Sequence, residues 1–138
     1  MDLNKLAEDV KKAEGLRLKP YQCTAGKVTI GYGRNLTDVG LSQQEVDLLF
    51  KNDLNTALRQ CWAEPFWPHV CDNDARARAM VELMFNLGVG KLRGFRKAIS
   101  ALMVNDFATA ADEFLDSAWA KQVGDRAKRL AAQIRDGV

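Results

Sequence analysis

Three side chains that can donate or accept protons lie close together near the start of the sequence. They are Glu14, Cys23 and Thr29, separated by eight and then by five residues. A carboxylic acid held in a cleft can protonate the leaving oxygen of a glycosidic bond, while groups on the opposite face of the sugar orient water or stabilise an oxocarbenium-like transition state. These residue types therefore suit acid-assisted cleavage of a glycoside.

The sequence before Glu14 predicts a helix that ends at this residue. Glu14 falls on the same apolar stripe as Leu3, Leu6 and Val10, so we expect its carboxyl to point toward a core. Gly15 can take the left-handed backbone that ends a helix. Burial and the negative end of the helix dipole would both favour the protonated acid.

After Gly15 the sequence pattern changes to that of a strand. Residues 28–33 alternate in type, and turn-forming residues 24–27 precede them, which favours a hairpin. A hairpin can bring Cys23 and Thr29 together. One face of the strand would carry Val28, Ile30 and Tyr32, and the other Thr29, Gly31 and Gly33.

The spacing of Glu14, Cys23 and Thr29, with TIGYG running on from the threonine, resembles the catalytic segment of T4-type phage lysozymes, the endolysins of glycoside hydrolase family 24. In that family the middle position is Asp or, in many phage and prophage members, Cys, as it is here. The resemblance extends over nearly the whole chain. Segments similar to the family's helical lobe follow in order: MVELMFNLG, Gly94-Phe95, Ser117-Ala118-Trp119 and Asp125–Arg129.

The resemblance implies a mostly α-helical α+β fold of the lysozyme type. In such a fold a small N-terminal β-hairpin lobe is joined by a long helix to a larger helical lobe, with a cleft between them. A chain of 138 residues is one ordinary domain. We expect the hairpin lobe over about 15–41, the linking helix over about 42–63, and the helical lobe over about 72–138 together with the N-terminal helix.

The resemblance also implies an activity. It is that of an N-acetylmuramidase, a lysozyme that hydrolyses the β-1,4 bond between N-acetylmuramic acid and N-acetylglucosamine in bacterial peptidoglycan, with inversion. Glu14 would be the acid, and Cys23 and Thr29 would hold or activate water; an ionised Cys23 could instead act as a nucleophile. Substrate contacts would come from Gly33, Asn35, Phe85 and Asn86, and Arg126 would lie near Glu14.

The implied biology is that of a phage or prophage endolysin that lyses its host. The partners would be peptidoglycan glycan strands and a holin-type protein that permeabilises the membrane. Charge interrupts the first nine residues, so we expect no signal peptide, no stable membrane insertion and synthesis in the host cytoplasm, with action on the cell wall after permeabilisation. We also expect a monomer.

The cysteines and the net charge exclude several other classes. Cys61 and Cys71 have neither CxxC spacing nor histidine neighbours, so we expect no metal, no cofactor and two small core residues, although a bridge between them stays open. A net charge of +2 does not indicate a nucleic-acid partner. Two basic runs are either solvated faces or surfaces that attract anionic wall polymer: Lys91, Arg93, Arg96 and Lys97, and Arg126, Lys128, Arg129 and Arg135.

The rest of the chain predicts a loop and then helices. We expect a loop over 34–40, a capping box from Ser42 to Glu45 that starts the long helix, and a buried central helix that ends near Gly88. Shorter helices should follow over about 95–104, about 107–116 and from about 125. His69 has no motif around it, and the aromatic residues between 62 and 67 are typical of a core edge.

Three alternatives to the hydrolase stay open. A non-catalytic wall-binding or phage structural protein could use the same fold. A lytic transglycosylase would cut the same bond and leave an anhydro-sugar end. A nucleic-acid-binding protein has less support, because no recognition motif accompanies the weak charge. This sequence also departs from the family pattern at Arg34, where many members have histidine. The family therefore does not predict which ion pairs form in the hairpin lobe.

Overall fold

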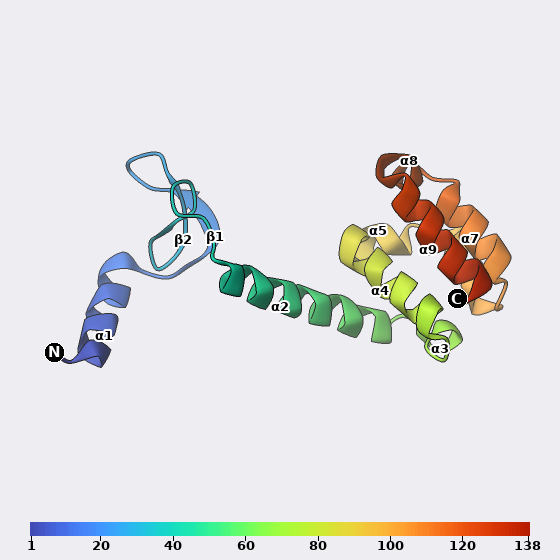
Figure 1. Cartoon of the computed structure of the whole chain (residues 1–138), viewed down its shortest axis with the longest axis horizontal. Coiled ribbons are helices and arrows are strands. Elements are labelled where there is room, and N and C mark those ends of the chain that lie inside the picture. Colours follow the sequence, from blue (N-terminus) through green and yellow to red (C-terminus); the bar gives the residue numbers. More distant parts are fainter. The chain divides into compact units, whose positions relative to one another are not determined.

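The structure is a computed structural model that describes residues 1–138. Contacts divide the chain into two compact units, unit 1 over Met1–Leu49 and unit 2 over Phe50–Val138, and the boundary falls inside α2 (Figure 1). The first helix is grouped with the strands of unit 1. The arrangement of both units as one lysozyme-like domain stays a prediction.

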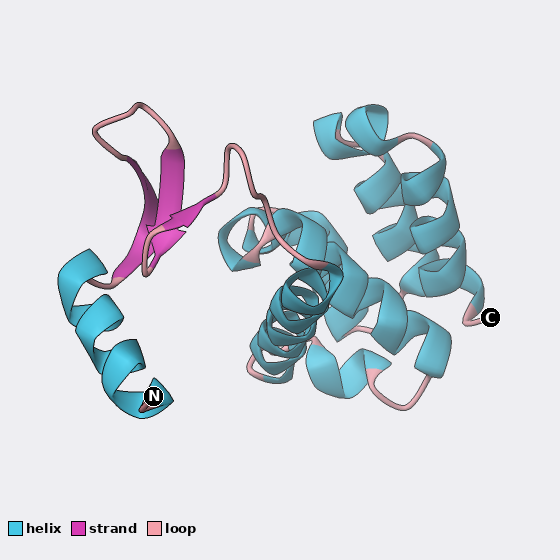
Figure 2. Cartoon of the chain, turned by 60° about the vertical axis from the view of Figure 1, so that its left-hand side comes forward, coloured by secondary structure: helices cyan, strands magenta, loops and turns pink.

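Unit 1 contains one helix, a small sheet and the start of a second helix. Helix α1 (Leu3–Glu14) is capped at its start by Asp2, whose Oδ1 accepts from the backbone N–H of Asn4 at 3.0 Å, and at its end by Gly15. The antiparallel sheet has the order β1-β2-β3, and its strands are drawn in magenta in Figure 2. Its strands are β1 (Arg17–Gln22), β2 (Val28–Gly31) and β3 (Arg34–Asn35). The predicted hairpin is confirmed, whereas the loop predicted at Arg34 and Asn35 is wrong, because both residues pair with β2.

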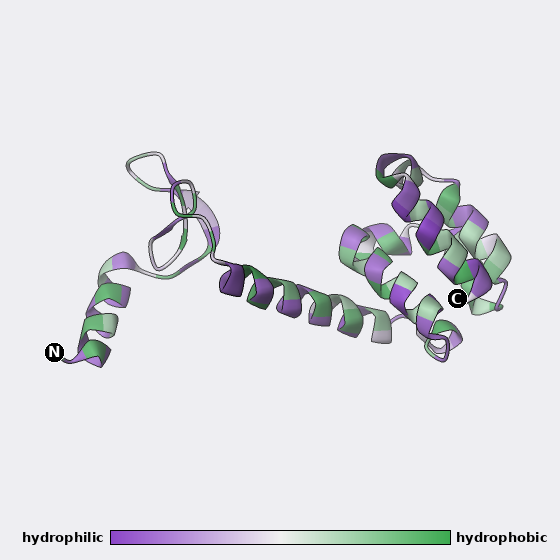
Figure 3. Ribbon diagram, viewed as in Figure 1, coloured by the Kyte–Doolittle hydropathy of each residue, from purple (hydrophilic) through white to green (hydrophobic).

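Unit 1 has almost no core. Thr29 is its only buried residue, with 5% of its surface exposed. The apolar stripe of α1 is exposed, including Leu6 and Val10 at 46% each, and Figure 3 shows these apolar segments along the helix. Glu14 is exposed as well. No residue of unit 1 buries its carboxyl, and the expectation that this group points into a core stays a prediction.

Helix α2 (Gln43–Trp62) begins with the predicted capping box. The Ser42 hydroxyl oxygen accepts from the Glu45 N–H at 3.2 Å, and Glu45 Oε1 accepts from the Ser42 N–H at 2.8 Å. Only Ala57 and Cys61 of this helix are buried. The inward stripe expected earlier in the helix is exposed, as at Phe50 (54%) and Leu54 (40%).

Unit 2 holds the apolar core. The buried helix predicted before Gly88 is confirmed as α4, and α7 and α9 pack against each other and against neighbouring helices. The predictions did not include the short helices α3, α5 and α8. The helices are α3 (Trp67–Val70), α4 (Asp74–Leu87), α5 (Val89–Arg93), α6 (Arg96–Met103), α7 (Phe107–Leu115), α8 (Ala118–Val123) and α9 (Asp125–Asp136). The mostly helical α+β class is confirmed.

The three cysteines are free. Cys61 is fully buried, and this burial raises the pKa of its thiol to about 12. Cys71 is exposed, so its expected place in the core is wrong: it follows the short helix α3 at the surface. His69 contacts Asn105 through Nδ1 at 3.0 Å. No helix has the length and apolar character needed to span a membrane.

Candidate active site

The carboxyl group of Glu14 lies directly against Gly33. A Cβ atom added at Gly33 would stand 2.7 Å from Glu14 Oε2 and 3.0 Å from Cδ. Gly33 also has a φ of +76°, which favours glycine, and it occupies the turn between β2 and β3. The absence of a side chain at Gly33 therefore gives the acid its place at the end of α1.

Cys23 and Thr29 are tied to one backbone carbonyl, that of Lys27. The Cys23 N–H donates to the Lys27 carbonyl at 2.9 Å, and the Thr29 hydroxyl donates to the same oxygen at 3.0 Å. The Gly26 N–H closes the turn onto the Cys23 carbonyl at 2.8 Å. The prediction that a hairpin brings Cys23 and Thr29 together is confirmed.

The surroundings of Cys23 favour its thiolate. Hydrogen bonds from the backbone at Lys27, and then at Ala25, lower the pKa of the Cys23 thiol, and the Thr29 hydroxyl adds to this effect. The hydroxyl has one proton, so it donates either to the Lys27 carbonyl or to the thiolate. When it donates to the carbonyl, its oxygen is left as an acceptor toward a water molecule.

The sheet aligns Thr29 with residues of both neighbouring strands. Tyr21 on β1 and Asn35 on β3 are the direct cross-strand partners of Thr29, so their side chains lie on the same face. Asn35 is already used in a turn: its Nδ2 donates to Asp38 Oδ2 and its Oδ1 accepts from the Asp38 N–H, both at 3.0 Å. The substrate contact expected from Asn35 stays a prediction.

Three further expected site residues, Phe85, Asn86 and Arg126, belong to unit 2, and the side chain of each contacts another side chain there. Asn86 Oδ1 accepts from Trp119 Nε1 at 2.7 Å, and Trp119 is buried. Phe85 is 40% exposed and meets Phe50 edge to face with 5.9 Å between ring centroids. These contacts give both residues a packing function, and their contact with substrate stays a prediction.

Arg126 forms an ion pair within unit 2. Its Nε lies 2.9 Å from Glu82 Oε1, and Arg129 binds the same oxygen at 2.6 Å. The hydrogen bond from Arg129, followed by that from Arg126, lowers the pKa of the Glu82 carboxyl. The guanidinium of Arg126 is therefore balanced by a carboxylate, and its expected place near Glu14 stays a prediction.

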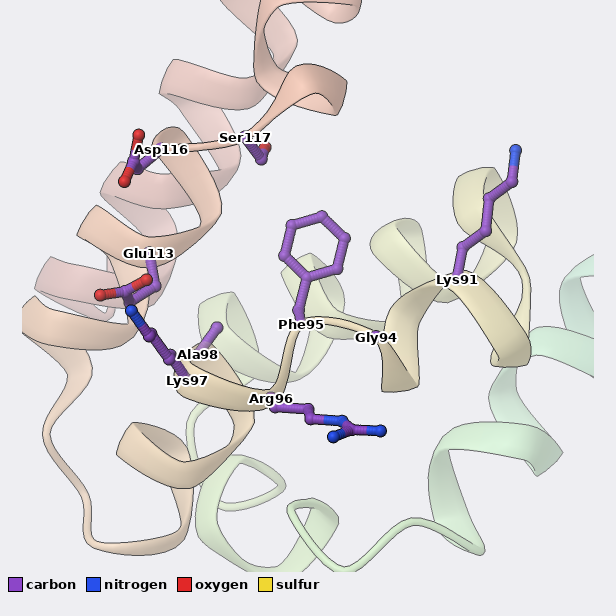
Figure 4. Close-up of a pocket in the computed structure, with 9 residues that line it drawn as sticks. All are labelled: Lys91, Gly94, Phe95, Arg96, Lys97, Ala98, Glu113, Asp116 and Ser117. Carbon is purple, nitrogen blue, oxygen red and sulfur yellow. The ribbon is translucent and has the colours of Figure 1, made fainter.

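A hollow of about 420 Å³, lined in large part by charged side chains, lies on the surface of unit 2 (Figure 4). The side chains of Lys91, Arg96 and Lys97 line it beside Phe95, and the acids Glu113 and Asp116 come from α7 and its end. None of the three cations has an ion-pair partner. In the other basic run all four cations have one: Arg126 and Arg129 with Glu82, Lys128 with Asp125, and Arg135 with Asp112.

A second, mostly apolar pocket of about 580 Å³ also belongs to unit 2. Side chains of α2 and α4 line it, among them Leu54, Leu58, Val81 and Phe85, with Glu82 and Arg126 at the same pocket. Phe85 thus takes part in an apolar surface rather than in a cluster of reactive groups.

From the sequence we did not predict that Gly33 leaves room for the Glu14 carboxyl. We also did not predict the ion pair between Arg34 and Glu45. The signal for the first was the glycine that follows the tyrosine of TIGYG, because a glycine in a turn after a strand often marks a positive φ. The structure contains no group of three or more His, Cys, Asp or Glu side chains that could hold a metal.

The chain is similar in sequence to a known family and to several known proteins. The family model described as Phage lysozyme matches residues 11–135. The "Endolysin" of Acyrthosiphon pisum secondary endosymbiont phage 1 is 30% identical over 85% of this chain and 80% of its own length. "Probable T4-type lysozyme 1" of Dictyostelium discoideum is 23% identical over 98% of this chain and 96% of its own length.

A third relative has a different kind of name. The "Pre-baseplate central spike protein Gp5" of Enterobacteria phage T4 is 28% identical over 96% of this chain. The chain spans only 28% of the length of that spike protein. The chain therefore resembles both an endolysin and a T4-type lysozyme of about its own size and one part of a much longer phage protein.

Proposed function

The chain belongs to the phage lysozyme family, and on that basis we propose that it is a lysozyme that hydrolyses bacterial peptidoglycan. The observation that carries the proposal is the placement of the Glu14 carboxyl on Gly33, in the same unit as the Cys23 and Thr29 pair. An acid that lies against a backbone and a pair that can hold water are the two parts that glycoside hydrolysis requires.

Each of the three side chains has a step in the proposed reaction. Glu14 donates its proton to the leaving oxygen as the glycosidic C–O bond breaks. The Thr29 oxygen, whose proton goes to the Lys27 carbonyl, accepts a hydrogen bond from the attacking water. Cys23, whose pKa is lowered, takes the proton that this water releases when its oxygen bonds to the anomeric carbon. The product then has the opposite anomeric configuration.

The bond we propose is the β-1,4 linkage between N-acetylmuramic acid and N-acetylglucosamine. Support comes from the family and from the printed names of the endolysin and lysozyme relatives. Mass spectrometry of a peptidoglycan digest identifies the bond, because a muramidase leaves muramic acid at the new reducing end. Glucosamine at that end would contradict this part of the proposal.

The experiment that tests the function is a digest of purified peptidoglycan by the unmodified protein, Glu14→Gln and Glu8→Gln. Loss of a general acid costs about 10² to 10⁴ in rate, so Glu14→Gln should slow the release of reducing ends by about that factor. Glu8 is an exposed acid on the same helix and serves as the matched control. Equal activity of the two variants would overturn the assignment of Glu14.

Configuration of the first product separates water attack from covalent catalysis. Inversion, seen by NMR in the first minutes of hydrolysis, agrees with Cys23 and Thr29 acting on water. Retention would replace that mechanism with a nucleophilic Cys23, and Cys23→Ser should then lose nearly all activity.

The match to the T4 spike protein favours a second candidate, a phage structural protein with the same fold. Such a protein would bind wall fragments without turnover, and Glu14→Gln would leave binding unchanged. A lytic transglycosylase is a third candidate, recognised by a product lighter by one water. The digest above distinguishes all three candidates.

We place the protein, within the same proposal, in the host cytoplasm after synthesis and at the cell wall once a holin-type partner has permeabilised the membrane. The unpaired cations Lys91, Arg96 and Lys97 would attract anionic wall polymer. Activity on intact wall should therefore fall with ionic strength, and a triple Ala variant should lose that dependence. A salt response equal to that of the unmodified protein would remove these residues from the proposal.

A further inference from the structure

Arg34 joins three separate parts of unit 1. Its Nη1 donates to Glu45 Oε1 at 2.7 Å and to the Gly40 carbonyl at 3.1 Å. Arg34 itself lies on β3, Gly40 lies in the following loop, and Glu45 belongs to the first turn of α2. One guanidinium thus connects the last strand, the loop and the helix.

The position of Arg34 along the chain links this connection to the acid. Gly33, on which the Glu14 carboxyl rests, is the residue directly before Arg34. Strand β3 has only two residues, and its pairing to β2 consists of Thr29 with Asn35 and Ile30 with Arg34. So short a strand has few backbone hydrogen bonds of its own, which makes the side-chain anchor at Arg34 important for where Gly33 lies.

Glu45 is well suited to hold Arg34. Its Oε1 also accepts from the Ser42 N–H at 2.8 Å, so the carboxylate is fixed to the start of α2. The Arg34 guanidinium, together with the backbone and hydroxyl of Ser42, lowers the pKa of Glu45 to about 2. The carboxylate is therefore charged throughout the pH range in which wall hydrolysis is assayed.

We propose that Arg34 and Glu45 are positioning residues for the Glu14 acid: by fixing β3 to the start of α2, the pair holds Gly33 under the carboxyl. This inference rests on the proposed function, because it assigns the pair to the catalytic step of the same site. Neither residue touches the acid; both act through Gly33.

The alternative is that the pair only stabilises the fold. Both side chains are more than one-third exposed, at 36% and 38%, and exposed ion pairs contribute little to stability. A purely structural pair should therefore change the melting temperature slightly and the activity in proportion. A positioning pair should change kcat by more than its effect on stability predicts.

The experiment compares Arg34→Ala with Ser42→Ala in the peptidoglycan digest and in thermal unfolding. Ser42→Ala removes the hydroxyl that caps the Glu45 N–H at 3.2 Å but leaves the Arg34 contacts, so it weakens the same helix start without releasing β3. We expect Arg34→Ala to lower kcat roughly ten- to a hundredfold with KM within about twofold, as a small displacement of a catalytic group does. Ser42→Ala should keep kcat within about twofold.

Two further measurements complete the test. Arg34→Lys retains a charge that can reach Glu45 and should restore most of the kcat lost in Arg34→Ala. Hydrogen exchange should show faster exchange of the Leu36 N–H, which donates to the Val28 carbonyl at 2.7 Å, in Arg34→Ala but not in Ser42→Ala.

Each outcome decides the proposal. If kcat falls in parallel with melting temperature in both Ala variants, or if Arg34→Ala retains full kcat, the pair is structural and the inference is wrong. If the unmodified protein releases no reducing ends, the proposed function fails, and the exchange of Leu36 still reports whether Arg34 holds β3.

Discussion

Unit 1 and unit 2 are built on different physical principles. Unit 2 contains every buried apolar residue of the protein, including Phe114, Leu130 and Ile134 at no more than 1% exposure. Unit 1 buries only Thr29. Its helix and strands are held together by helix caps, strand pairing and the Arg34–Glu45 ion pair. The candidate chemistry therefore lies in the unit with little core, where hydrogen bonds rather than packing set the positions of side chains.

The largest effect that tests this comparison is on stability. Phe114→Ala removes a side chain from a fully packed core and should cost about 3–5 kcal/mol, whereas Leu18→Ala in unit 1, where Leu18 is 81% exposed, should cost less than about 0.5 kcal/mol. Denaturant unfolding measures both. A cost for Leu18→Ala similar to that of Phe114→Ala would mean that unit 1 has a core as well.

The second effect is on activity. Gly33→Ala would bring a Cβ to 2.7 Å from Glu14 Oε2 and should lower kcat by about a hundredfold through displacement of the acid. Gly88→Ala is the matched control, because Gly88 has a similar φ of +80° but no atom within 4 Å of the added Cβ. It should lose comparable stability and retain activity. Equal activity losses would trace the effect to backbone strain instead.

A third prediction compares the reactivity of the Cys23 thiol of unit 1 with that of the Cys61 thiol of unit 2, in a variant that carries Cys71→Ser. The pKa of Cys23 is lowered by the backbone at Lys27 and Ala25, and that of Cys61 is raised to about 12 by burial. Iodoacetamide should therefore modify Cys23 at a lower pH in the folded than in the unfolded protein, while Cys61 reacts only after unfolding. Mass spectrometry of the alkylated peptides measures both rates. Equal reactivity of Cys23 in the two states would contradict the thiolate-favouring turn.

The smallest expected effect concerns acid stability. Because the folded-state pKa of Glu45 is about 2 and its ordinary value is 4.5, its contribution is complete above pH 4.5 and is lost as the pH falls toward 2. The melting temperature of the Glu45→Gln variant should therefore depend less on pH between about 4.5 and about 2 than that of the unmodified protein. Glu8→Gln, an exposed acid in the same unit, should leave the curve unchanged. An unchanged curve for Glu45→Gln would mean that the ion pair contributes nothing to unit 1.

Much of the local structure could be predicted because it depends on neighbours in the sequence. Gly15 ends α1, residues 24–27 turn the hairpin, and Ser42 with Glu45 starts α2, all through hydrogen bonds within a few residues. The buried helix α4 was predictable as well, since it is apolar on more than one face. The association of Cys23 with Thr29 followed from the hairpin alone.

Contacts between segments far apart in the chain depended on the tertiary structure. The apolar stripe of α1 predicted burial, yet no other element of unit 1 buries it, because periodicity records an apolar face and not its partner. Glu14 meets Gly33 across 18 intervening residues and Arg34 meets Glu45 across ten, contacts that depend on how β3 returns beside β2. The sequence by itself determined which groups could do chemistry; the tertiary structure decided what holds them, because a side chain's partner across a sheet depends on strand register and not on spacing along the chain.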